Sequence, residues 1–253
     1  MEFLFLGRGA AFNPLEGNTS CYFIENNELF LIDCGETIFQ TIIKNKILDN
    51  IKQIHIMITH THSDHVGSLA TLILYSNNIL NIKPNIIISN TLLYIDDIKV
   101  YLRIQGVLEE DYNLIDVSNY TNYNTFNSIE FIETLHTSKL HCYGIKFNTN
   151  EGIIYYSGDT RNLDNIINII HSNDNIDKIY VDTSSEYVED SVHVYIEDLK
   201  EEIPVNLRDR IYCMHINDNK CIDLIEEYGF NIVRLIWKKA LIIKNMLKYK
   251  VKR

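Results

Sequence analysis

The sequence predicts an α+β protein built as a four-layer αββα sandwich, and three observations lead to it. Each half of the chain opens with consecutive strand-like runs and ends with strand-like runs that alternate with helical ones. Two such halves, packed sheet against sheet with their helices outside, give four layers. With only three prolines and ten glycines the chain has no linker-like tract, so we expect one domain over residues 1–253.

The strands of the first half are recognised by β-branched and aromatic runs between turn residues. Its helices are recognised by apolar residues at helical spacing, as at Ile38, Ile42 and Ile47. In chain order we expect strands at 2–7, 19–25 and 28–35, a helix at 37–48, a strand at 52–59, a helix at 67–76, a strand at 85–89 and a helix at 91–105.

The second half repeats this arrangement, with three consecutive strand-like runs before the alternation begins. We expect strands at 128–135, 143–149 and 152–158, a helix at 163–172, a strand at 178–182, a helix at 194–203, a strand at 210–215, a helix at 221–229 and a strand at 231–236. The parallel strands of each half should end at a common edge of their sheet.

The charge pattern bears on the kind of partner. The formal net charge is −11, whereas a protein that grips a long polyanion usually shows a basic face. The one basic run is "WKKALIIKNMLKYKVKR", which has seven positive residues and no acid. It predicts a terminal helix with solvated lysines, and the alternative is a small patch that steers phosphates.

The cysteines and the N-terminus indicate a compartment. Five cysteines without a CxxC pair argue against a disulfide framework, so reduced thiols and a cytoplasmic location are expected. The opening "MEFLFLGRGA" lacks the features of a signal peptide. No uncharged apolar stretch approaches the ~18 residues that span a bilayer, and no membrane contact is expected.

The stretch "THTHSDH" at residues 59–65 is the strongest chemical signal. It places His60, His62, Asp64 and His65 where a strand ends and a helix begins. Imidazole together with carboxylate suits Zn²⁺, and two neighbouring sets of such ligands suit a pair of ions. The alternative is a polar loop in which Ser63 or Asp64 caps the helix, but four ligand types in six positions favour metal.

Three further candidates stand at the ends of apolar strands. "ETLH" ends in His136, "YYSGDT" contains Asp159, and "IYCMH" ends in His215. Taken singly, each is compatible with ordinary capping or turn chemistry. Together with the histidine-rich loop, they predict a metal site at one edge of the sandwich.

This ligand pattern resembles the metallo-β-lactamase superfamily from about Gly7 to Leu235. The resemblance implies two Zn²⁺ ions, with Mn²⁺ as a possible substitute. One ion would bind His60, His62 and His136, the other Asp64, His65 and His215, and Asp159 would bind both. Asp33 in "LIDCG" falls on the early aspartate that orients the metal loop. The fold serves several hydrolytic reactions, so this pattern alone does not identify the substrate.

His193 in "EDSVHVYIEDL" narrows the reaction class. Its position ahead of His215 resembles the tRNA 3′-processing (tRNase Z-like) phosphodiesterase branch, where such a histidine assists the leaving group. The resemblance implies attack by a metal-bridging hydroxide, with Asp64 and His193 as catalytic residues. The alternative for His193 is a residue that merely begins a helix. We expect His55 and His171 to be structural.

The spacing departs from the tRNA-processing pattern. Only 23 positions separate His136 from Asp159, so the long RNA-gripping arm of that branch is missing. With the net charge, this favours a small nucleotide over a large nucleic acid. The opening "GRGAAFN…GNTS…LIDCGETIF" is similar to the anti-Pycsar phosphodiesterases of phages, which destroy cyclic CMP and cyclic UMP.

That resemblance implies a homodimeric enzyme that hydrolyses a 3′,5′-cyclic nucleotide and so evades an anti-phage defence. Cyclic CMP and cyclic UMP are the first candidates, and cyclic AMP and cyclic GMP follow. Three alternatives remain open: a tRNA 3′-processing endoribonuclease, a lactone or thioester hydrolase, and a non-catalytic binding protein that keeps the fold.

Overall fold

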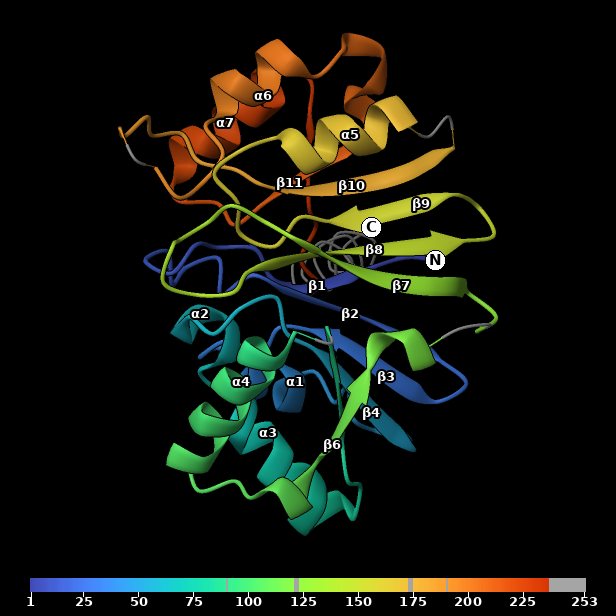
Figure 1. Ribbon diagram of the computed structural model, residues 1–253. Helices are drawn as coiled ribbons and strands as arrows, with labels where there is room; N and C mark the ends of the chain where they lie inside the picture. The colour runs from blue at the N-terminus through green and yellow to red at the C-terminus, as the bar shows by residue number, and fades with distance from the viewer. Residues whose placement is uncertain (90, 121–122, 173–174, 190, 237–253) are drawn as a thin grey trace, which may run out of the picture.

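The computed structural model describes residues 1–236 except 90, 121–122, 173–174 and 190. Two sheets face each other, and helices cover both outer faces, which confirms the expected four-layer sandwich (Figure 1). The helix expected over residues 237–253 lies outside the described residues. Within the described part, no helix is long and apolar enough to cross a membrane.

The first sheet is antiparallel at one edge and parallel beyond it. Its order is β1-β2-β3-β4-β5-β6; β1–β3 pair antiparallel, whereas β3–β6 run parallel. The strands are β1 Leu4–Gly7, β2 Ser20–Glu25, β3 Glu28–Ile32, β4 Gln53–Met57, β5 Asn85–Ile88 and β6 Asn113–Asp116. The helices on its outer face are α1 Ile38–Lys44, α3 Leu69–Tyr75 and α4 Leu92–Ile104, whereas the short helix α2 Ser63–Val66 lies at the strand ends (Figure 1).

The second sheet repeats this plan in the order β12-β11-β10-β9-β8-β7, with β7–β9 antiparallel and β9–β12 parallel. Its strands are β7 Phe126–Glu133, β8 Tyr143–Thr149, β9 Ile153–Tyr156, β10 Ile176–Asp182, β11 Ile211–Met214 and β12 Asn231–Ile232. Its outer face carries α5 Asp164–Ser172, α6 Ile196–Glu202 and α7 Asn219–Glu227 (Figure 1).

Four expectations need correction. Strand β6 was not expected, because its four residues are polar at both ends and none is fully buried. The last strand, expected at 231–236, is only the two-residue β12, followed by an isolated bridge between Leu235 and Phe5. The first helix, expected at 37–48, ends at Lys44. The histidine-rich loop contains the short helix α2, which was not expected.

Strand β3 shows how alternation builds the core. Leu29 and Leu31 pack toward the outer helices, whereas Phe30 and Ile32 pack into the space between the two sheets. Both faces are therefore buried, which explains the uninterrupted apolar run. Between the sheets, the ring of Phe30 contacts that of Phe126 on β7 of the second sheet, at a centroid distance of 5.7 Å. This aromatic layer holds the two sheets together.

The parallel strands bring their carboxyl ends to one rim of the sandwich. Asp33 follows β3 and His60 comes three residues after β4, while Asp159 and His215 follow β9 and β11 in the other sheet. In open parallel sheets the crevice outside these ends is where ligands bind. The packing of the two sheets therefore decides where the predicted site residues lie.

We expect Phe30→Ala to lower the free energy of unfolding by about 3–5 kcal/mol, because it leaves a cavity in the aromatic layer. Phe30 is fully buried, whereas Phe12 is fully exposed. Phe12→Ala is therefore the matched control and should change stability by less than about 0.5 kcal/mol. Urea titration followed by circular dichroism measures both. Equal stability of the two variants would contradict the assigned core.

Candidate metal centre

The structure brings the seven side chains predicted as metal ligands together at the rim. Ligand atoms of His60, His62, His136 and Asp159 all lie within 4.8 Å of one another. Atoms of Asp64, His65, Asp159 and His215 form a second such group. Asp159 belongs to both groups, as the expected shared ligand must.

In the first group, ring nitrogens from three segments of the chain face one another. His62 Nδ1 lies 2.9 Å from His60 Nε2 and 3.2 Å from His136 Nε2. His136 Nδ1 donates to the carbonyl of Val192 at 2.7 Å, which leaves the lone pair of Nε2 directed into the group. Burial, and then the neighbouring His65, holds the pKa of His60 well below its usual range, so its ring is neutral. Neutral imidazoles are the form that binds metal.

In the second group, two imidazoles face two carboxylates. Asp64 Oδ2 lies 3.3 Å from His215 Nε2 and 3.4 Å from His65 Nε2. Asp159 Oδ1 is 3.3 Å from His65 Nε2, and its Oδ2 is 3.5 Å from His215 Nε2. Burial alone would raise the pKa of Asp159, but His215 and His65 hold it well below the usual range. The carboxylate is therefore ionised.

The donors fit a pair of divalent cations. Asp33, Asp159 and Asp182 are each at most 3% exposed, and burying so much negative charge is costly without positive charge beside it. The buried Nε2 of His65 also has no hydrogen-bond partner among the described residues. Cations between the rings and the carboxylates would add positive charge beside these aspartates and give His65 Nε2 a partner.

Asp33 fixes the orientation of His65. Its two carboxylate oxygens accept hydrogen bonds from Thr59 N, Thr59 Oγ1 and His65 Nδ1, each at 2.8 Å. With Nδ1 engaged in this way, His65 presents Nε2 to the centre. Asp33 has a φ of 61°, a left-handed conformation that aspartate tolerates better than most residues.

Gly35 lets this loop lie directly against the histidine-rich loop. A Cβ at Gly35 would be 1.9 Å from the carbonyl oxygen of Asp64, so any larger residue would push the backbone of a predicted ligand aside. Next to it, Cys34 N donates to the carbonyl of His65 at 2.7 Å. The two loops are held as one unit.

His193 lies beside the centre and is held by an aspartate that the sequence analysis missed. His193 Nδ1 is 2.7 Å from Asp182 Oδ2 and 4.0 Å from Asp159 Oδ2. Its side chain is 27% exposed, so the ring connects the buried centre to solvent. Burial lowers the pKa of His193, but the Asp182 carboxylate outweighs this and raises it above the usual value.

Asp182 contacts two histidines, His193 and His215. Its Oδ2 also accepts from Thr160 N at 3.0 Å, and its Oδ1 faces His215 Nδ1 at 3.3 Å. Its position in the sequence could have identified Asp182 as a candidate. It ends the apolar strand "KIYVD", just as His215 follows the apolar run "IYCM". Its interactions indicate that it orients both rings.

Two of the three remaining histidines, His55 and His171, were expected to be structural. His55 is buried between Glu28 and Tyr120, 2.7 Å from each, and its ring stacks on Phe30. His171 is exposed near the end of α5. Neither belongs to the ligand groups among the described residues.

Comparison with known proteins places this geometry in a family. A family model described as "Anti-Pycsar protein Apyc1" matches residues 1–234. An anti-Pycsar protein Apyc1 from Bacillus phage BSP38 is 28% identical over 236 residues, covering 85% of this chain and 88% of that protein.

Solved structures agree with the fold. The metallo-β-lactamase fold protein YhfI from Bacillus subtilis superposes with a TM-score of 0.68 at 15% identity, over 92% of this chain and 95% of that one. Human tRNase Z, short form, gives a TM-score of 0.59 at 17% identity, over 93% and 97%. The expected metallo-β-lactamase fold is confirmed.

We expect Asp33→Asn to weaken Zn²⁺ binding by about 10–100-fold, because the amide cannot accept all three hydrogen bonds and His65 loses its fixed orientation. Competition with a chelating dye measures the affinity. Asp209→Asn, at an exposed aspartate on another surface, is the control and should bind as the unmodified protein does. Equal affinities of the two variants would contradict this role of Asp33.

Proposed function

The chain belongs to the anti-Pycsar Apyc1 family, and from this premise we propose that it is a metal-dependent phosphodiesterase acting on a 3′,5′-cyclic nucleotide. The observation that carries the proposal is the pair of ligand groups sharing Asp159, with His193 beside them. Cyclic CMP and cyclic UMP are the proposed substrates, ahead of cyclic AMP and cyclic GMP. Their removal would let a phage evade a defence that signals through them.

Two Zn²⁺ ions are the proposed cofactors, with Mn²⁺ as the alternative. His60, His62 and His136 would hold one, and Asp64, His65 and His215 the other, with Asp159 contacting both. When bound, two such cations lower the pKa of a water molecule into the neutral range and offset the charge of a phosphodiester.

The proposed role of His193 is to protonate the leaving oxygen. A water oxygen attacks phosphorus, the bond from phosphorus to O3′ breaks, and the departing alkoxide needs a proton. His193 is held through Nδ1 by Asp182, so Nε2 is the atom left to donate it. The Asp64 carboxylate is proposed to accept the proton that the water loses. The product is the nucleoside 5′-monophosphate.

The segment between His136 and Asp159 supports a small substrate. Its described residues form β8, β9 and the turns around them, so nothing there reaches out to grip an RNA. The net charge of −11 points the same way, because it repels a long polyanion. We further propose a cytoplasmic homodimer that contacts neither a membrane nor a large nucleic acid.

Incubation of the zinc-loaded protein with four cyclic nucleotides, a precursor tRNA and a lactone tests the substrate class. We expect a cyclic pyrimidine nucleotide to be converted to its 5′-monophosphate, as followed by liquid chromatography, and the tRNA to stay intact. Cleavage of the tRNA alone would establish the processing endoribonuclease instead. Opening of the lactone alone would establish a carboxylic-ester hydrolase.

We expect His193→Ala to reduce kcat/KM for the cyclic nucleotide by about 10²–10⁴-fold, because the leaving oxygen loses its acid. Bound zinc, measured by atomic absorption, should stay the same. His171→Ala is the matched control on an exposed helix and should keep full activity. Full activity of His193→Ala would rule out its role as the acid.

A further inference from the structure

The N-terminal loop, residues 8–18, connects β1 to β2, and no step of the proposed reaction uses it. It reads "RGAAFNPLEGN" and closes on itself. Gly9 N donates to the carbonyl of Gly17 at 2.7 Å, and Arg8 N donates to the carbonyl of Glu16 at 3.1 Å. Figure 1 shows the loop, in dark blue, at the same edge of the sandwich as α2. It is therefore a compact unit close to the metal centre.

One side of the loop is hydrogen-bonded to Ile216, the residue that follows the predicted ligand His215. Ile216 N donates to the carbonyl of Arg8 at 2.8 Å. The carbonyl of Ile216 accepts from Ala10 N at 3.0 Å and from Asn13 Nδ2 at 2.9 Å. His215 itself has a φ of 57°, a left-handed conformation that is uncommon outside glycine. The loop therefore fixes the backbone beside a ligand that adopts an uncommon conformation.

The other side of the loop packs on the segment that supports Asp64. Asn18 N donates to Thr37 Oγ1 at 2.9 Å, and Thr37 N donates to Asn18 Oδ1 at 2.8 Å. Asn18 also lies against Gly35, where an added Cβ would be 2.8 Å from the Cβ of Asn18 and 1.9 Å from the carbonyl oxygen of Asp64. The loop and the backbone of Asp64 are therefore neighbours of the same glycine.

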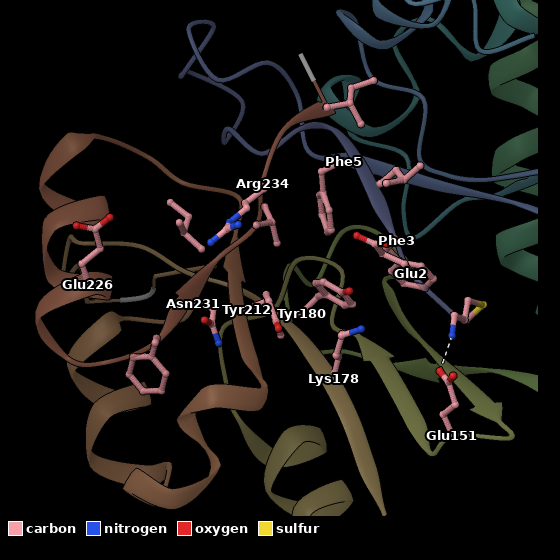
Figure 2. A pocket seen from close by; sticks show the side chains of 16 residues that line it. Glu2, Phe3, Phe5, Glu151, Lys178, Tyr180, Tyr212, Glu226, Asn231 and Arg234 are labelled. Atoms are coloured by element: carbon pink, nitrogen blue, oxygen red, sulfur yellow. Dashed lines mark hydrogen bonds and ion pairs between the residues drawn. The ribbon is translucent and has the colours of Figure 1, made fainter. Parts of the chain in front are cut away.

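Arg8 anchors the start of the loop to the second sheet. Its guanidinium pairs with Glu16 at 2.7 Å through Nε and donates to the carbonyl of Val233 at 2.9 Å through Nη1. Val233 lines a hollow of about 760 Å³ between the edge strands β1 and β12 (Figure 2). Arg8 is almost completely buried, and a guanidinium held by two partners leaves the loop little freedom to shift.

We propose that the N-terminal loop sets the separation of Asp64 and His215, with Asn13 and Asn18 as positioning residues for the ion that these two ligands share with His65. Asp64 follows a strand of the first sheet and His215 follows a strand of the second, yet Asp64 Oδ2 lies 3.3 Å from His215 Nε2. The loop contacts the supports of both ligands. The inference rests on the metal binding in the proposed function, and it is independent of the substrate.

The ligands of the other ion are supported by other segments of the chain. His136 is held through the carbonyl of Val192, and His60 lies beside Thr59 Oγ1. Loosening the loop should therefore weaken the ion at Asp64 and His215 and spare the ion at His60 and His136. A general loss of stability would weaken both ions, so this selectivity separates positioning from a merely structural role.

Zinc titration against a chelating dye, in two backgrounds, tests the selectivity. His62→Ala leaves a complete ligand set only in the group of Asp64 and His215, whereas His215→Ala leaves one only in the group of His60 and His136. Adding Asn13→Ala to the first background should weaken zinc binding by about 10–100-fold, the range for residues that orient ligands. Adding it to the second background should leave the affinity unchanged.

Asn150→Ala is the matched control for Asn13→Ala. Asn150 Nδ2 also donates to a backbone carbonyl, that of Asn124 at 3.3 Å, but it lies in the turn between β8 and β9, at the opposite ends of the strands. This variant should bind zinc as its background does. Asn18→Ala removes the acceptor of Thr37 N and should reproduce the effect of Asn13→Ala.

Hydrogen exchange of the metal-free protein gives a second measurement. The amide of Ile216, which donates to Arg8, should exchange several-fold faster in Asn13→Ala than in Asn150→Ala, and circular dichroism checks that both are folded. Equal weakening of zinc in the two backgrounds, or no weakening in either, would overturn the proposal. Failure of the unmodified protein to bind zinc would overturn the metal centre with it. The expected zinc result without cleavage of any cyclic nucleotide would support this inference and overturn only the proposed substrate.

Discussion

Buried negative charge at the ends of parallel strands is the constraint on which the arrangement of this rim depends. Asp33, Asp159 and Asp182 each end or follow a strand and are almost completely buried. Carboxylates in such a place must be compensated, and here imidazole rings, hydroxyls and backbone N–H groups surround them. The histidines are therefore held as much by the aspartates as by their own backbone.

The sandwich makes that compensation possible, because the charges come from both sheets. Asp33 follows a strand of the first sheet, whereas Asp159 follows one strand of the second sheet and Asp182 ends another. Aromatic contacts between the sheets, Phe30 with Phe126 and Phe23 with Phe147, set the separation of the sheets. Gly35 allows the final close approach of two loops within the first sheet. The packing of the core therefore determines the geometry of the site.

The predicted ligands could be found from sequence because metal-binding residue types stood immediately after apolar strands, where accessible sites form. Asp182 could not be predicted in this way, because aspartates are common at strand ends. Its role is visible only from its contacts with His193 and His215, which lie 11 and 33 positions further along the chain. Strand β6 was not predicted because its four residues are too few to show a recognisable strand pattern. Phe3, Tyr180 and Tyr212, which line a hollow beside β1, could not be grouped from the sequence either, because they meet only in the folded chain.

Asp159 belongs to both ligand groups, and this has a thermodynamic consequence. If ions bind as proposed, the first to arrive withdraws negative charge from the carboxylate that the second also needs, so the two occupancies are linked rather than independent. The linkage is reciprocal, so either ion weakens the other by the same factor. A population of half-filled protein would then exist over a range of zinc supply, and the amount of competent enzyme would follow the weaker step.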